Sequence, residues 1–189
     1  MKSEKLIHYS FLMLGIFIFL TGIGLIGLKE HEEIPKPPAT TVTTQFAFPE
    51  FGLKIPTLQI EAPVVADVPG DKKEAYFKAL ENGVAQFKGT KKPGEGGLIF
   101  IFGHSSFYPW ANGGYKEIFE NLEDIKDGDE ILVWYQKKEY KYKVFETKVV
   151  LPTDVSVLEE TPNEQLSLMT CVPPGTAEKR LIVNARPIK

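Results

Sequence analysis

Short apolar segments separated by turn residues fill the chain from residue 50 to its end at residue 189. The run 98–102 is apolar without a break, and the run 141–150 alternates apolar and polar side chains. Such runs are typical of strands, buried on both faces in the first case and on one face in the second. Further strand patterns cover residues 53–60, part of 62–68, 130–135, 166–170 and 181–185. Residues 50–189 are therefore predicted to form a mainly β domain, folded as a barrel or a sandwich.

Two short segments of this domain have a helical pattern instead. Residues 71–82 place apolar side chains on one face, with Asp71 available as an N-terminal cap and Gly83 as a stop. Residues 115–122 predict a second short helix. Residues 153–165 are predicted to be a long polar loop.

A long apolar run precedes the domain. Residues 11–28 contain no charged side chain, and the run extends back to Leu6. At about 1.5 Å per residue this is enough helix to cross a hydrocarbon core of roughly 30 Å. The apolar region of a cleaved signal peptide, the alternative, is normally about 7–15 residues long. The sequence therefore predicts a short tail at 1–5 and an uncleaved transmembrane signal-anchor helix at 6–28.

Residues 29–49 are charged and then rich in proline and threonine, a composition that cannot bury a core. They are expected to act as a linker that holds the domain off the membrane. A short N-terminal tail ahead of a large C-terminal domain favours an N-in orientation. We therefore expect a single-pass protein of the cell membrane with its domain outside the cytoplasm.

Charge and cysteine content exclude several function classes. The formal net charge of −3 gives no electrostatic case for nucleic-acid binding. A single cysteine excludes an internal disulfide bond, and the sequence shows no cluster of metal-ligand residues. We accordingly expect neither a metal nor a cofactor.

The segment 166–175 contains Cys171, the one cysteine of the chain. The predicted strand 166–170 delivers its thiol to the strand end, and a Pro/Gly turn follows. A lone cysteine placed in this way is a candidate nucleophile. The alternative is a small buried hydrophobe, because free cysteine is among the most buried residue types. The segment alone leaves both interpretations open.

A cysteine nucleophile needs a partner that exchanges its proton, and His104 is the one histidine of the predicted domain. It follows the run 98–102, where a rigid strand gives way to a loop, although a solvated loop histidine is the alternative. Two of the 22 basic residues are arginines, Arg180 and Arg186. A guanidinium can hold a carbonyl oxygen or a developing oxyanion. Arg186 lies nearer the chain end, where a surface role is the alternative, so Arg180 is preferred.

These residues resemble the sortases, cysteine transpeptidases of the bacterial cell surface. The resemblance is carried by Thr170-Cys171 after an apolar strand, by Arg180 nine positions later and by Gly103-His104 after an earlier strand. It covers nearly the whole chain, and points to a class D/E-like or an uncharacterised class. Further matches are the segments 53–65, 83–97, 127–130 and 155–158.

The resemblance implies a closed eight-stranded barrel with one or two short helices, and with Cys171, His104 and Arg180 around one groove. Cys171 would attack an LPxTG-like sorting signal and form a thioacyl intermediate, with His104 as acid and then base. The acceptor would be an amine of a peptidoglycan peptide or a pilin lysine, and water would give hydrolysis instead. Arg180 would bind the substrate carbonyl or oxyanion. We also expect Thr170, Ser105 and Trp110 to contact the substrate.

The chain departs from the common family pattern around these residues. Val172-Pro173-Pro174-Gly175 replaces the familiar aromatic and Phe-Gly, Ser105 replaces a basic residue, and the insert 107–115 is long and aromatic. This insert is either a packed surface loop or a wall or lid of the groove, and the sequence leaves both interpretations open. The Ser-x-Gly-Cys motif of the L,D-transpeptidases, a rival class, is absent. A membrane-tethered, non-enzymatic β domain that binds a surface polymer is the remaining alternative.

Overall fold

The computed structural model describes residues 50–106 and 113–188. The predicted tail, transmembrane helix and linker (1–5, 6–28 and 29–49) therefore lie outside the described residues, as does most of the insert 107–115. Among the described residues, no helix has the length and apolar character needed to span a membrane. The elements are β1 (Phe51–Ile55), η2 (Pro56–Leu58), β2 (Ile60–Val68), α2 (Lys73–Glu81), β3 (Val84–Phe87), β4 (Leu98–Phe102), η3 (Leu122–Asp124), β5 (Glu130–Tyr135), β6 (Lys138–Val150), η4 (Val155–Leu158), β7 (Gln165–Val172) and β8 (Lys179–Pro187).

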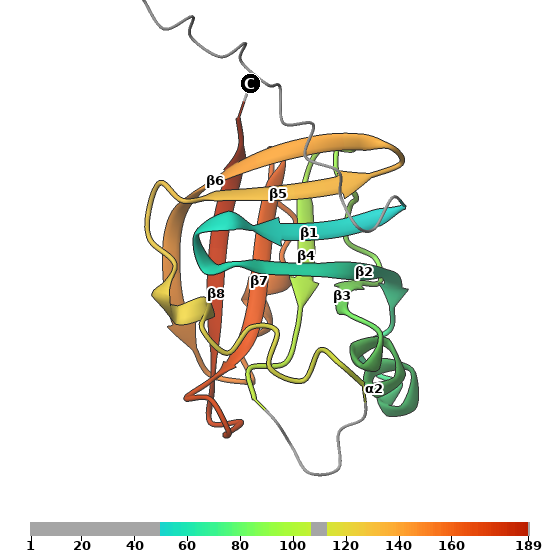
Figure 1. Ribbon diagram of the computed structural model, residues 1–189, viewed down its shortest axis with the longest axis vertical. Helices are drawn as coiled ribbons and strands as arrows, with labels where there is room; N and C mark the ends of the chain where they lie inside the picture. The colour runs from blue at the N-terminus through green and yellow to red at the C-terminus, as the bar shows by residue number, and fades with distance from the viewer. Residues whose placement is uncertain (1–49, 107–112, 189) are drawn as a thin grey trace, which may run out of the picture. The chain divides into compact units, whose positions relative to one another are not determined.

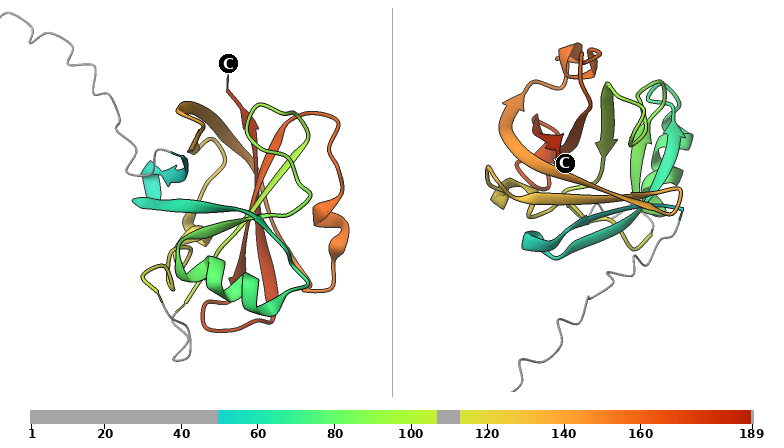
Figure 2. Two further views of the ribbon diagram at one scale, coloured as in Figure 1. Left: turned by 90° about the vertical axis from the view of Figure 1, so that its right-hand side faces the viewer. Right: turned by 90° about the horizontal axis from the view of Figure 1, so that it is seen from above.

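The eight strands form a closed barrel in the order β1-β2-β3-β4-β7-β8-β6-β5, and β1 and β5 close the ring (Figures 1 and 2). The pairs β2–β3 and β4–β7 are parallel, and the other pairs are antiparallel. The barrel alternative of the sequence prediction, with the eight strands that the family resemblance implied, is therefore confirmed.

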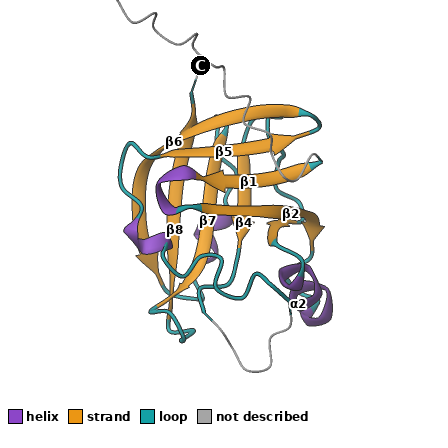
Figure 3. Cartoon of the chain, viewed as in Figure 1, coloured by secondary structure: helices purple, strands orange, loops and turns teal. Residues whose placement is uncertain are grey.

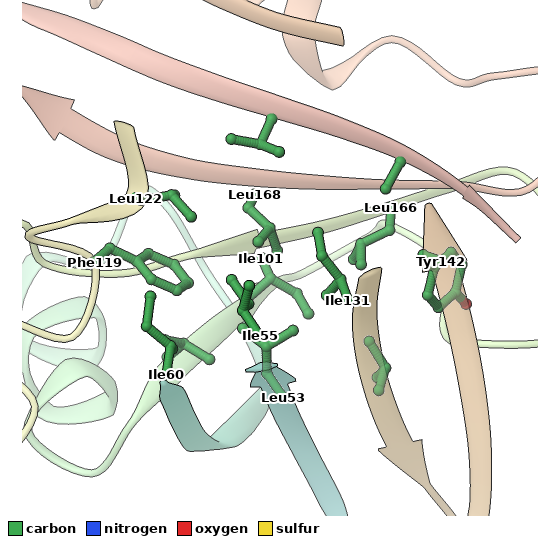
Figure 4. Packing of buried hydrophobic residues seen from close by; sticks show 14 of the residues in the cluster. Leu53, Ile55, Ile60, Ile101, Phe119, Leu122, Ile131, Tyr142, Leu166 and Leu168 are labelled. Carbon is green, nitrogen blue, oxygen red and sulfur yellow. The ribbon is translucent and has the colours of Figure 1, made fainter. Parts of the chain in front are cut away.

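The uninterrupted apolar run of β4 is explained by burial on both of its faces. Ile99 and Ile101 belong to the larger buried cluster, which fills the barrel. Leu98, Phe100 and Phe102 point the other way, into a second cluster that includes α2. The interior cluster also receives side chains from β1, β5, β6 and β7, as Figure 4 shows for Leu53, Ile55, Ile131, Tyr142, Leu166 and Leu168.

The helix predicted at 71–82 is present as α2, but its cap differs from the expectation. The N-cap residue is Lys72, without a side-chain cap, so the cap expected from Asp71 is wrong. At the other end the helix stops at Asn82, whose side-chain amide donates to the Lys78 carbonyl at 2.8 Å. Gly83 follows with a φ of 152°, and a Cβ there would lie 2.2 Å from the Pro63 carbonyl oxygen.

The second predicted helix, 115–122, is wrong. This segment forms turns, and the short 3-10 helix η3 follows it (Figure 3). Phe119 and Leu122 are fully buried in the barrel cluster, and the Phe119 amide donates to the His104 carbonyl at 2.9 Å. The apolar side chains of this segment therefore pack a turn against the barrel. The backbone of the segment forms a hydrogen bond with the loop after β4 and does not continue as a helix.

The substitution Leu168→Ala tests how much packing inside the barrel contributes to stability. Leu168 is fully buried, so Leu168→Ala removes packed methyl groups and leaves a cavity, and we expect the free energy of unfolding to fall by about 2–5 kcal/mol. Urea unfolding of the full chain, followed by tryptophan fluorescence, measures the change. Val155→Ala is the matched control, because Val155 is 74% exposed and its truncation should cost no more than about 0.5 kcal/mol. Equal stability of the two variants would contradict this packing.

Candidate active site

Three neighbouring strands bring the predicted site residues together. In the parallel pair β4–β7, Phe102 lies opposite Met169, so the next two positions on each strand lead to His104 and Cys171. In the antiparallel pair β7–β8, Cys171 lies directly opposite Arg180. Directly opposed residues of an antiparallel pair have Cβ atoms about 5 Å apart. The thiol and the guanidinium therefore start from adjacent backbone positions, and the imidazole comes from the strand on the other side.

The strand faces put this site on the outside of the barrel. Leu166, Leu168 and Val172 of β7 belong to the interior cluster, so Cys171 points outward. On β8, Leu181 and Val183 point inward in the same way, and Arg180 points outward. Residues 180, 182, 184 and 186 alternate with these inward positions and share the outer face of β8.

Thr170 of β7 forms a hydrogen bond with the loop after β4, which carries His104. Its side chain is buried, and its hydroxyl donates to the Gly103 carbonyl at 3.0 Å. The Gly103 amide donates to the Met169 carbonyl at 3.1 Å. A Cβ at position 103 would lie 2.7 Å from the Phe119 ring, which leaves glycine as the residue that fits there. Thr170, which we expected to contact substrate, has its hydroxyl committed to this internal bond.

Burial acts on the Cys171 thiol and on the His104 imidazole in opposite directions. Cys171 is partly buried, which raises the pKa of its thiol, while the charge of Arg180 acts to lower it. Burial lowers the pKa of His104, because it disfavours the charged imidazolium. Both groups are therefore shifted toward their neutral forms.

The two arginines occupy different environments. The Nη1 atom of Arg180 donates to the carbonyls of Ala177 and Lys179, at 3.1 and 3.0 Å, so the side chain is held against the β7–β8 turn. The guanidinium of Arg186 lies over the Phe145 ring, 3.9 Å from its centroid. Six strand positions separate the two, or about 20 Å at roughly 3.3 Å per residue. The structure thus brings Arg180, and not Arg186, to Cys171.

Ser105 and Trp110 are the two remaining residues that the sequence analysis expects to contact substrate. Ser105 is 1% exposed, and within the described part of the chain its hydroxyl has no hydrogen-bond partner. Trp110 lies outside the described residues. Across residues 50–106 and 113–188, no group of three or more His, Cys, Asp or Glu side chains could hold a metal ion.

A groove of about 330 Å³ lies on the outer face of β4 and β7 beside Arg180. Phe102 and Met169 line it from the strands, and Leu151 and Val155 line it from the segment between β6 and β7. Leu151 and Val155 are 62% and 74% exposed, so this side of the groove presents apolar surface to solvent. The sequence predicts a polar loop at 153–165 and does not predict this apolar lining, although Val155, Val157 and Leu158 within that segment are a usable signal.

The closed barrel carries a cysteine on β7, an arginine opposite it on β8 and a histidine on the loop after the adjoining strand β4, which is the make-up of a cysteine acyl-transfer enzyme. A model of the sortase domain matches residues 53–188, and the chain therefore belongs to the sortase family, whose members are cysteine transpeptidases.

The similar proteins carry names of several sortase classes. The chain is 29% identical over 135 residues to Sortase D of Bacillus subtilis (strain 168), and the match covers 69% of this chain and 60% of that protein. The chain thus spans about three fifths of that relative. Among solved structures it is similar to Sortase A from Corynebacterium diphtheriae, with a TM-score of 0.60, 32% identity, and coverage of 74% of this chain and 60% of the other. A Clostridium perfringens Sortase D5 transpeptidase gives a TM-score of 0.59, 26% identity, and coverage of 74% and 79%.

Thiol alkylation tests the electrostatics of this site. Cys171 is the one cysteine, so the rate of iodoacetamide alkylation against pH reports its thiolate alone. Because burial raises the pKa of Cys171, we expect the midpoint to lie above that of a free cysteine peptide. Arg180→Ala removes the charge that opposes this shift, so the midpoint should rise further, whereas Arg186→Ala should leave it in place. A midpoint below the peptide value, or equal effects of the two arginines, would contradict this description.

Proposed function

We propose that this protein is a membrane-anchored sortase that cleaves an LPxTG-like sorting signal and joins the cleaved protein to an amine. The observation that carries the proposal is the pairing of Cys171 with Arg180 across β7 and β8, with His104 on the loop after the adjoining strand β4. Family membership supports the reaction class.

In the acylation step, the Cys171 sulfur attacks the carbonyl carbon of the Thr–Gly peptide bond of the sorting signal. The carbon–nitrogen bond then breaks, and the His104 imidazolium gives its proton to the leaving amine. The product is a thioester between Cys171 and the threonine carbonyl, together with neutral His104. In the second step an incoming amine attacks the thioester, His104 takes the proton from the amine nitrogen, and the Cys171 thiolate leaves. Water in place of the amine gives hydrolysis.

The pKa directions determine which protonation state is abundant. The pKa of Cys171 is raised and that of His104 is lowered, so near neutral pH the thiol and the neutral imidazole predominate. The reactive thiolate–imidazolium pair is then the minor form. This state limits the rate, and it also keeps the single thiol of the chain from reacting indiscriminately, because the thiolate is the nucleophilic form.

Arg180 is suited to the developing oxyanion. Its guanidinium has five N–H donors in a fixed plane, so one nitrogen can hold the β7–β8 turn while others bind a substrate carbonyl. The groove beside it suits the apolar part of a sorting peptide, since Phe102, Met169, Leu151 and Val155 line it.

The location of the enzyme and its partners are part of the same proposal. Residues 6–28 would anchor the chain as a single N-in span, and residues 29–49 would carry the domain out to substrates at the cell surface; both assignments rest on the sequence alone. The acceptor would be a peptidoglycan amine or a pilin lysine, and the groove does not distinguish between them.

Cys171→Ala tests the nucleophile. A fluorogenic LPxTG-containing peptide is incubated with the full chain in detergent micelles, with and without an amine acceptor, and the products are read by mass spectrometry. The wild-type chain should show an acyl-enzyme adduct at Cys171 and an amine-joined product, and the variant should show neither, because the thioester cannot form. Product formation by Cys171→Ala would exclude this mechanism, and a wild-type product that contains only water would identify a hydrolase.

Comparing the two arginines tests the oxyanion donor. Arg180→Ala should lower kcat/KM for the same peptide by on the order of 10²–10³, the usual cost of one oxyanion-hole donor. Arg186→Ala should change kcat/KM little, because its guanidinium lies against Phe145 and away from Cys171. The reverse order of effects would assign the role to Arg186.

A further inference from the structure

Helix α2 places two consecutive aromatic rings against the strand and loop that carry His104. The Tyr76 ring stacks on Phe102, the last residue of β4, with centroids 4.9 Å apart and planes 9° apart. The Phe77 ring stacks on the His104 imidazole, with centroids 6.4 Å apart and planes 26° apart. The two rings also meet edge to face, with centroids 5.5 Å apart. Figure 1 shows α2 beside the end of the barrel at which β4 stops.

We propose that Phe77 is a positioning residue for His104, holding the imidazole plane in place and excluding water from one of its faces. The proposal deepens the proposed function and rests on it only for the role of His104 in proton transfer. It adds a residue of the helix to a site that is otherwise built from β4, β7 and β8.

His104 lies two residues beyond the end of β4, where the strand ladder no longer holds the chain. Among the described residues, the Gly103 amide and the His104 carbonyl make backbone bonds at this point, to Met169 and Phe119. The Phe77 ring adds a contact to the imidazole itself. A flat ring 6.4 Å from the imidazole centroid and nearly parallel to it favours one orientation of the imidazole, because ring pairs at this separation attract one another.

The helix is rigid enough to serve as the support. Ala79 and Leu80 are 5% and 1% exposed and belong to the second buried cluster, together with Phe102. The stacking of Tyr76 on Phe102 fixes the rotation of the helix about its axis. Phe77 is therefore held by packing that also holds β4, so the ring and the imidazole share one framework.

Charged groups approach this corner from three elements. Cys171 comes from β7, Arg180 lies opposite it on β8, and the Lys73 ammonium lies over the Phe77 ring, 5.9 Å from its centroid. The pKa of His104 is nevertheless lowered by burial. Loss of the Phe77 ring would admit water to the imidazole, so the pKa of His104 should rise toward its ordinary value.

The test compares Phe77→Leu, which removes the ring but keeps apolar bulk, with Phe77→Tyr, which keeps the ring. Lys78→Ala is the control, since Lys78 is an exposed residue of the same helix. The full chain, labelled at histidine, is titrated by NMR in detergent micelles, and the His104 signal is identified by its loss in His104→Asn. This measurement needs no substrate, so it decides the inference even if the LPxTG peptide is not turned over. Values of kcat and KM for that peptide form the second measurement.

In Phe77→Leu we expect the His104 ring protons to lose their ring-current shift and the His104 titration to move to higher pH. At the optimum of each variant kcat should fall about tenfold, because a misdirected imidazole transfers protons less well, while KM stays within about twofold. Phe77→Tyr and Lys78→Ala should match the wild type in the NMR titration and in kcat. An unchanged titration and ring-current shift in Phe77→Leu would overturn the proposal. A raised KM with unchanged kcat would also overturn it, since it would make Phe77 a substrate contact.

Discussion

The parallel pairing of β4 with β7 is the constraint on which the rest of the molecule depends. Parallel strands end at the same edge of a sheet, so this pair delivers the histidine loop and the cysteine to one place. The link between the two strands contains β5 and β6, so the pairing joins segments that are far apart in the sequence. Two bonds extend the contact beyond β4, from the Gly103 amide to Met169 and from the Thr170 hydroxyl to Gly103. The geometry of the site is thus a consequence of the long-range pairing of β4 with β7.

Strands β4 and β7 contribute both to the stability of the barrel and to the groove, because each face of the pair has its own role. Their inward side chains fill the barrel, while Phe102 and Met169 face outward and line the groove. Farther back on the outer face the character changes to polar: the Ser167 hydroxyl donates to Asn184 at 2.7 Å, and Asn184 donates to Glu146 at 2.6 Å. The outer surface of these strands therefore has a polar end whose groups bond to one another and an apolar, open end beside Arg180.

The sequence was sufficient for features with a local cause and insufficient for those that depend on distant packing. Continuous apolar character predicted β4, and strand patterns predicted the strands that became β7 and β8. No local signal announces the parallel pairing of β4 with β7, so the proximity of His104 and Cys171 came from the family resemblance. The segment 115–122 was mistaken for a helix because burial against a barrel and burial along a helix give similar apolar spacing. The bond from the buried Thr170 hydroxyl to the Gly103 carbonyl likewise has no local signal, because it depends on the pairing of β7 with the distant strand β4.

Burial strengthens the polar interactions with substrate but disfavours the thiolate, and the position of Arg180 offsets the second effect. A groove that excludes water strengthens every polar interaction with a bound carbonyl, but it also disfavours the thiolate that must attack that carbonyl. A fixed cation opposite the thiol relieves the second effect without admitting water. Arginine suits this position better than the abundant lysine, since its charge persists when buried and its planar donors bind the turn carbonyls as well. Cross-strand pairing fixes the backbone positions of the two residues, and the bonds from Arg180 to the turn carbonyls hold its side chain, so the favourable charge is present before substrate arrives.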